Sequence, residues 1–142
     1  MNSLNQQPFI FEQQVSWGDM DAFGHVNNVI YYRYIESARI SFLNELGVFN
    51  YLINVVVSSN NCQYFSPVVY PDILKIEVKI LEVRNSAFRM HYILWSENQQ
   101  KIVAASEAVI VCVNQDNNQK VMIPSDLKEK MIILKDKNNK DF

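Results

Sequence analysis

The stretch 27-NNVIYYRYIESARISFLNELG-47 decides the fold, because it carries the one long helical pattern in the chain. Apolar side chains recur at intervals of 4, 3, 4 and 4 residues, at Tyr31, Ile35, Ala38, Phe42 and Leu46. This spacing stacks them on one face of a helix, which we expect from Ile30 to Leu46. Asn27 or Asn28 can cap its start by accepting from backbone N–H groups, and Gly47 can end it in the left-handed conformation.

Strand-like runs lie on both sides of this helix. They alternate apolar and polar residues or are rich in β-branched residues, and they cover Phe9–Trp17, Ile53–Phe65, Leu74–Ile80, Phe88–Leu94 and Ile102–Val113. We expect hairpin connections at Asn85-Ser86 and at 97–100, and consecutive pairing of the four strands that follow the helix. The prediction is an α+β fold, one five-stranded antiparallel sheet with one long helix on one face. Such a sheet is only partly covered, so we also expect a homo-oligomer.

The C-terminal part of the chain has a weaker pattern. A short helix is expected from Ser125 to Leu134, with Ser125 as its cap, followed by a polar tail over 135–142. We see no internal repeat and no linker, and 142 residues suit a single domain, here assigned to 1–134.

Composition excludes several classes of protein. With 49% hydrophobic and 20% charged residues the chain has the make-up of a globular protein, and a net charge of -2 argues against a nucleic-acid or anionic-membrane partner. Only three glycines occur, and no P-loop or dinucleotide fingerprint can be built from them. The two cysteines, Cys62 and Cys112, are too isolated for a zinc or CxxC site, and no metal is expected. No signal peptide is visible, so we expect a cytoplasmic protein.

The chemistry-bearing residues gather in the loop before the helix. They are Asp19, Asp21, His25, Asn27 and Asn28. A helix N-terminus offers unpaired N–H donors and a partial positive charge, which suit a carbonyl oxygen that gains negative charge, and a nearby carboxylate can activate water or attack the carbonyl. The same residue types also populate ordinary helix-entry turns, so the spacing alone is a weak signal. The second histidine, His91, is expected to be an ordinary sheet residue.

The segment VSWGDMDAFGHVNNVIYYRYIESARISFLNELG, residues 15–47, resembles the signature of the 4-hydroxybenzoyl-CoA thioesterase family of hotdog-fold proteins. The matching features are the pair Asp19 and Asp21, the stretch 24-GHVNN-28, the aromatic pair at 31–32, and Glu36-x-x-Arg39. The later strands follow the family's order as well, with 64-YFSP-67 leading into the third strand and 123-IP-124 preceding the final helix.

The resemblance implies a sheet wrapped around a central helix, with subunits that join their sheets into a homodimer or homotetramer and share active sites. It implies hydrolysis of acyl-CoA thioesters to a free acid and CoA, with CoA as part of the substrate and no cofactor. Asp21 would be the catalytic carboxylate, the Asn28 N–H would polarise the thioester carbonyl, and His25 would orient the loop or the substrate. Asp19, Asn27 and Tyr31 would bind substrate.

Several alternatives stay open. Asp21 could act as nucleophile or as general base, and the acyl group is not identified, because aromatic residues line aliphatic and aromatic pockets alike. Three cationic residues could bind the phosphates of CoA, namely Arg84, Arg89 and Lys79, but the same residues also suit solvated strand positions. Where relatives place Gly-Asp before the third strand, this chain has Pro71-Asp72, which changes that turn. A hotdog dehydratase on hydroxyacyl thioesters and a non-catalytic acyl-thioester binding module are the competing hypotheses.

Overall fold

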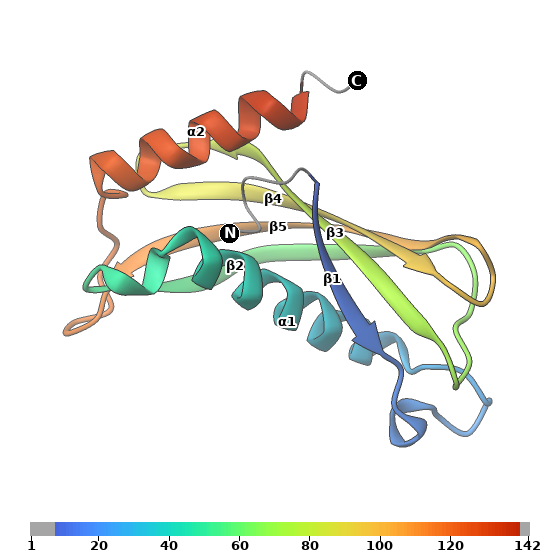
Figure 1. Cartoon of the computed structure of the whole chain (residues 1–142). Helices are drawn as coiled ribbons and strands as arrows, with labels where there is room; N and C mark the ends of the chain where they lie inside the picture. The colour runs from blue at the N-terminus through green and yellow to red at the C-terminus, as the bar shows by residue number, and fades with distance from the viewer. Residues whose placement is uncertain (1–7, 140–142) are drawn as a thin grey trace.

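The computed structural model of the chain describes residues 8–139, which form five strands and two α-helices (Figure 1). The strands are β1 (Phe9–Gln14), β2 (Ile53–Tyr64), β3 (Ile73–Val83), β4 (Ala87–Ser96) and β5 (Lys101–Asn114). The helices are α1 (Asn28–Leu46) and α2 (Ser125–Asn139), with single 3-10 turns at Trp17–Asp19 and Val48–Asn50. The strand and helix types predicted from the sequence are therefore confirmed, with end points that differ by a few residues.

The strands form one antiparallel sheet in the order β1-β3-β4-β5-β2. The hairpins joining β3 to β4 and β4 to β5 are confirmed, but the prediction that all four later strands pair consecutively is wrong. β2 pairs with β5 and not with β3, from Ile53 opposite Asn114 to Tyr64 opposite Ala104. The chain leaves β2 through residues 65–72, a segment too long for a tight hairpin, which crosses to the opposite half of the sheet before β3 begins.

The core lies on one face of this sheet. Alternate residues of β3, Leu74, Ile76, Val78 and Ile80, are buried against the helices, while Lys75, Glu77 and Lys79 face the other way. α1 lies along this face in Figure 1 and buries its predicted apolar stripe there. Phe42 of α1 meets Phe9 of β1 edge to face, with ring centroids 5.3 Å apart.

The ends of α1 follow the sequence signals. The Asn27 side chain accepts a hydrogen bond from the Val29 N–H at 2.9 Å, and Gly47 adopts the left-handed conformation with φ of 88°. Glycine is needed at Gly47 because a side chain there would strain the backbone.

The second helix is longer than expected. α2 runs from Ser125 to Asn139, so residues 135–139 of the predicted polar tail are helical, and residues 140–142 lie outside the described part of the chain. Leu127, Met131 and Leu134 are buried in the same core as α1, which explains why the helix is stable. The fold thus has two long helices on the sheet, of 19 and 15 residues, where the sequence predicted one long helix and a short one.

Candidate active site

The loop before α1 is a compact turn held by its own backbone. The Asp21 N–H donates to the His25 carbonyl at 2.8 Å, and the Gly24 N–H donates to the Asp21 carbonyl at 3.0 Å. Gly24 has φ of 83°, a conformation that a residue with a side chain rarely adopts. The turn then joins the rest of the fold, because the Val26 N–H donates to the Val68 carbonyl at 2.8 Å. The polar residues of the loop are therefore fixed relative to both α1 and the 65–72 segment.

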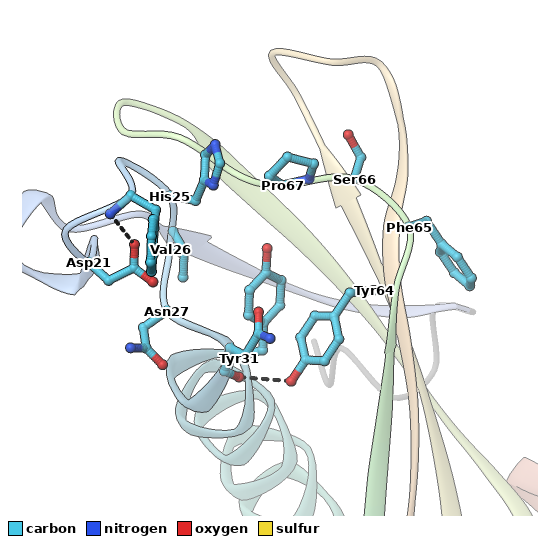
Figure 2. A pocket seen from close by; sticks show the side chains of 11 residues that line it. Asp21, His25, Val26, Asn27, Tyr31, Tyr64, Phe65, Ser66 and Pro67 are labelled. Carbon is cyan, nitrogen blue, oxygen red and sulfur yellow. Dashed lines mark hydrogen bonds between the residues drawn. The ribbon is translucent and has the colours of Figure 1, made fainter.

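Asp21 presents one free carboxylate oxygen. Its Oδ1 accepts from the Phe23 N–H at 2.9 Å, an interaction typical of an Asx turn, and the described residues donate no hydrogen bond to Oδ2. The side chain is half-buried at the wall of a pocket (Figure 2). A carboxylate oriented in this way by a backbone N–H can accept a proton from water or attack an acyl carbon with its second oxygen.

The helix N-terminus supplies a donor to the same pocket. Of the first N–H groups of α1, Val29 is satisfied by the Asn27 side chain and Ile30 by the Asn27 carbonyl at 2.9 Å. Within residues 8–139 the Asn28 N–H has no acceptor, and Asn28 lines the pocket together with Asp21. This is the arrangement that stabilises negative charge on a carbonyl oxygen, because an unpaired amide and the helix dipole act together.

Asp19 is placed differently from the sequence prediction. It does not line the pocket, and its Oδ2 accepts a hydrogen bond of 2.6 Å from the hydroxyl of Tyr34. The same hydroxyl accepts from the Ser16 N–H at 3.3 Å, and the Asp19 carbonyl accepts from the Asn27 N–H at 3.1 Å. Asp19 thus fastens the loop to α1, and its predicted contact with a substrate stays a prediction.

The other predicted site residues do come together. His25, Asn27 and Tyr31 line the pocket with Asp21 and Asn28, His25 as an exposed residue at the rim and Tyr31 as a buried one behind it. Burial raises the pKa of the Tyr31 hydroxyl, so it is a neutral group near pH 7. The pocket has a volume of about 680 Å³, and among residues 8–139 no arginine or lysine lines it.

The opposite wall of the pocket was not predicted. It is formed by residues that follow or end β2, namely Tyr64, Phe65, Ser66 and Pro67 (Figure 2). Tyr64 packs edge to face on Tyr31 at a centroid distance of 4.9 Å. Sequence reasoning found these residues only as part of the family's strand order. Their position depends on β2 pairing with β5, although an aromatic pair just before a proline is a signal that could have drawn attention to them.

A polar network holds this second wall. The Gln99 amide donates to the Pro67 carbonyl at 2.8 Å, and its oxygen accepts from the Ser66 hydroxyl at 2.6 Å. Gln99 N–H donates to Ser96, whose hydroxyl donates to the buried Asp72. Asp72 also accepts from backbone N–H groups, so the departure at Pro71-Asp72 leaves that carboxylate fully bonded. The turn between β4 and β5 therefore supports the pocket from behind.

The candidate phosphate-binding residues lie away from the pocket. Arg84 pairs with Glu82 at 2.8 Å, Arg89 with Glu107 at 3.3 Å, and Lys79 with Glu77 at 3.2 Å. None of the three cations lines the pocket.

Three further observations concern His91, metal binding and membrane-spanning helices. His91 is half-buried on β4, opposite Lys79 and Glu107 in the sheet register, and burial lowers its pKa. Across residues 8–139 no group of three His, Cys, Asp or Glu side chains is placed to hold a metal ion. In the same part of the chain, neither helix combines the length and apolar character that membrane crossing requires.

Known proteins are similar to this chain in sequence and in fold. The profile of the thioesterase-like superfamily matches residues 15–131. The Bacillus subtilis protein YsmA is 31% identical over 127 residues, which cover 87% of this chain and 85% of YsmA. The long-chain acyl-CoA thioesterase FadM of Escherichia coli is 25% identical over 116 residues, 79% of this chain and 88% of FadM. A DHNA-CoA thioesterase from Staphylococcus aureus superposes over 94% of each chain with a TM-score of 0.83 at 18% identity, a likeness of fold.

Proposed function

Because the chain belongs to the thioesterase-like superfamily of hotdog-fold proteins, we propose that it hydrolyses an acyl-CoA thioester to a free carboxylic acid and CoA. One observation carries the proposal: Asp21, which has a carboxylate oxygen without a donor, and Asn28, whose N–H has no acceptor within residues 8–139, line the same pocket. The named activity of FadM, a thioesterase on long-chain acyl-CoA, agrees with this reaction class.

The chemistry needs one carboxylate, one amide donor and water. As a general base, Asp21 takes a proton from water while the water oxygen bonds to the thioester carbon, and the carbonyl oxygen gains negative charge toward the Asn28 N–H. Collapse of this intermediate breaks the carbon–sulfur bond, and the CoA thiolate takes the proton back from Asp21. As a nucleophile, Asp21 would instead bond to the acyl carbon, expel the thiolate and form an anhydride that water then hydrolyses. Both routes consume one water and need no cofactor, because CoA is part of the substrate and product.

The remaining pocket residues would bind the substrate. Tyr31 forms an apolar wall for the acyl group, Asn27 offers its side-chain amide at the helix N-terminus, and His25 at the rim orients the loop or the substrate. The lack of lysine and arginine in the lining suits the uncharged thioester end of the molecule, so the CoA phosphates would bind elsewhere.

A second copy of the chain belongs to the proposal. β2 lies at the end of the sheet, and within residues 8–139 its outer edge has no strand partner. Most side chains between Val56 and Phe65 are exposed, including those beside the pocket. An edge of 12 residues left open is a template for another chain. A homodimer or homotetramer that shares active sites between subunits is therefore our expectation. A cytoplasmic location and the lack of nucleic-acid or membrane partners stay predictions from the sequence.

The proposal is tested by thiol release. The wild-type protein and the Asp21→Asn variant are offered short, long and aromatic acyl-CoAs, and free CoA is measured with a thiol reagent after both proteins are shown to have the same melting temperature. Turnover by the wild type and its loss in the variant support the proposal, and the panel identifies the acyl class. Absence of turnover with retained binding of acyl-CoA would instead favour the binding module, and dehydration of a hydroxyacyl thioester would favour the dehydratase.

A further inference from the structure

The last residue of β2 reaches across to the first turn of α1. The Tyr64 hydroxyl donates a hydrogen bond of 2.9 Å to the carbonyl of Asn28, 36 residues earlier in the chain (Figure 2). The Tyr64 ring packs on Tyr31, one helical turn further along α1. Tyr64 is therefore bonded to the residue whose N–H is the donor in the proposed reaction.

The bonded carbonyl is part of a fixed chain of hydrogen bonds. The peptide group between Asn28 and Val29 accepts from Tyr64 through its oxygen and donates through the Val29 N–H to the side chain of Asn27 at 2.9 Å. The peptide plane is thus held from both ends, from β2 on one side and from the helix cap on the other. The neighbouring peptide, which carries the Asn28 N–H, is joined to it through the Cα of Asn28, so only the two backbone dihedrals of that residue separate the held plane from this N–H.

The first turn of a helix needs such support. Its N–H groups lack the intrahelical partners that fix later turns, and helix ends fray for this reason. Asn28 and Val29 are both exposed, so packing contributes little to holding them. The contact with Tyr64 supplies a restraint from the sheet. Burial raises the pKa of the Tyr64 hydroxyl well above its usual value, so the hydroxyl keeps its proton and stays a donor at any pH at which the protein would work.

We propose that Tyr64 is a positioning residue that aims the Asn28 N–H at the thioester carbonyl by holding the first turn of α1 against β2. The inference rests on the proposed function, and it assigns to Tyr64 a role in the reaction without contact with the reacting atoms. A restraint of this kind acts mainly when the carbonyl oxygen becomes charged, because a donor a few tenths of an ångström out of place loses more interaction with an oxyanion than with a neutral carbonyl.

The test is Tyr64→Phe, which keeps the ring on Tyr31 and removes only the hydroxyl. Its matched control is Tyr51→Phe, because the Tyr51 hydroxyl donates a hydrogen bond of 2.6 Å to Asp126 and Tyr51 does not line the pocket. We expect kcat to fall about 5-fold in Tyr64→Phe with KM within about twofold of wild type, the loss that one hydrogen bond supports. The control should keep the wild-type kcat.

A second measurement separates this inference from the proposed function. Amide resonances of Asn28 and Val29 are recorded by NMR in the wild type and in both variants, with no substrate present. Tyr64→Phe should shift both resonances and speed their exchange with solvent, and Tyr51→Phe should not. If the wild type hydrolyses no thioester, the proposed function fails, and the resonances alone decide whether Tyr64 fixes this turn. Unchanged resonances, an unchanged kcat in an active enzyme, or an equal loss in the control would each overturn the positioning role.

Discussion

The hydroxyl of Tyr34 links α1 to the loop that carries Asp19 and Asp21. Tyr34 is only 3% exposed, yet its hydroxyl donates to Asp19 at 2.6 Å and accepts from the Ser16 N–H. Replacing Tyr34 by Phe keeps the buried ring and leaves the Asp19 carboxylate and the Ser16 N–H without this partner. The variant therefore tests whether the link between α1 and the loop holds the site together.

The expected loss of stability depends on the kind of hydrogen bond that the substitution removes. A hydrogen bond to a charged group contributes about 1.5–3 kcal/mol, and Asp19 is only partly solvated, so we expect a loss of about 2 kcal/mol in the free energy of unfolding. For a chain of 142 residues this corresponds to a decrease in Tm of roughly 5–8 °C. Because the Asp19 carbonyl also accepts from the Asn27 N–H, we expect kcat to fall as well, by about 3- to 10-fold.

The pH dependence of the effect gives an independent check. Burial, with a further contribution from the hydrogen bond to Asp19, raises the pKa of Tyr34 to about 12, whereas a tyrosine in the unfolded chain has a pKa near 10. Between these values the unfolded chain loses the proton and the folded protein keeps it. The stabilisation from Tyr34 is therefore complete below about pH 10 and is lost as the pH rises through about 12. The difference in stability between wild type and Tyr34→Phe should shrink over this range.

Urea unfolding followed by circular dichroism at several pH values measures both effects. The control is Tyr70→Phe, an exposed tyrosine whose hydroxyl makes no hydrogen bond with residues 8–139, and it should match the wild type within about 0.5 kcal/mol. A Tyr34→Phe variant as stable as the wild type at pH 7, or a difference that stays constant from pH 9 to pH 12, would refute the reasoning.

Three further changes probe the cap, the core and a buried cation. Asn27→Ala removes the side chain that accepts from the Val29 N–H; we expect about 1 kcal/mol less stability in urea unfolding, whereas Asn27→Asp should keep the cap. Phe42→Ala opens a cavity beside Phe9, and calorimetry should show a loss of about 3–5 kcal/mol, with a loss below 1 kcal/mol contradicting the packing. Arg39 is 5% exposed, and within residues 8–139 its one hydrogen bond goes to Tyr92, so Arg39→Met should change stability by less than about 1 kcal/mol, while a large loss would reveal an ionic role.

The comparison of sequence and structure is clearest in the loop and helix. A cap at Asn27 or Asn28, a left-handed end at Gly47 and the buried stripe of α1 were all predicted, since each depends on residues within a few positions of one another, and the structure selects Asn27 as the cap. For the same reason the sequence predicted that five residues would lie together, and all five line one pocket: Asp21, His25, Asn27, Asn28 and Tyr31. The role of Asp19 did not follow, because its partner Tyr34 lies 15 residues away on a helix face that the sequence does not orient relative to the loop.

The order of the strands could not be obtained from local pattern. Alternation identified β3, β4 and β5, but it says which face a strand buries and not which strand lies beside it. The pairing of β2 with β5 is decided by closure of the core around both helices. It places Tyr64, Phe65, Ser66 and Pro67 opposite the loop. The extension of α2 to Asn139 has the same origin, since residues 135–139 have a polar sequence and yet Asn138 is buried in the folded chain.

The sequence by itself determined the elements, the caps of α1, the loop with Asp21 and the family signature, because these are properties of neighbouring residues. Only the tertiary structure decided that β2 lies at the far edge, that its last tyrosine reaches the Asn28 carbonyl, and that the pocket has two walls. Contacts between residues distant in the chain depend on how the whole core closes, and the free energy that selects them comes from burial shared by every element.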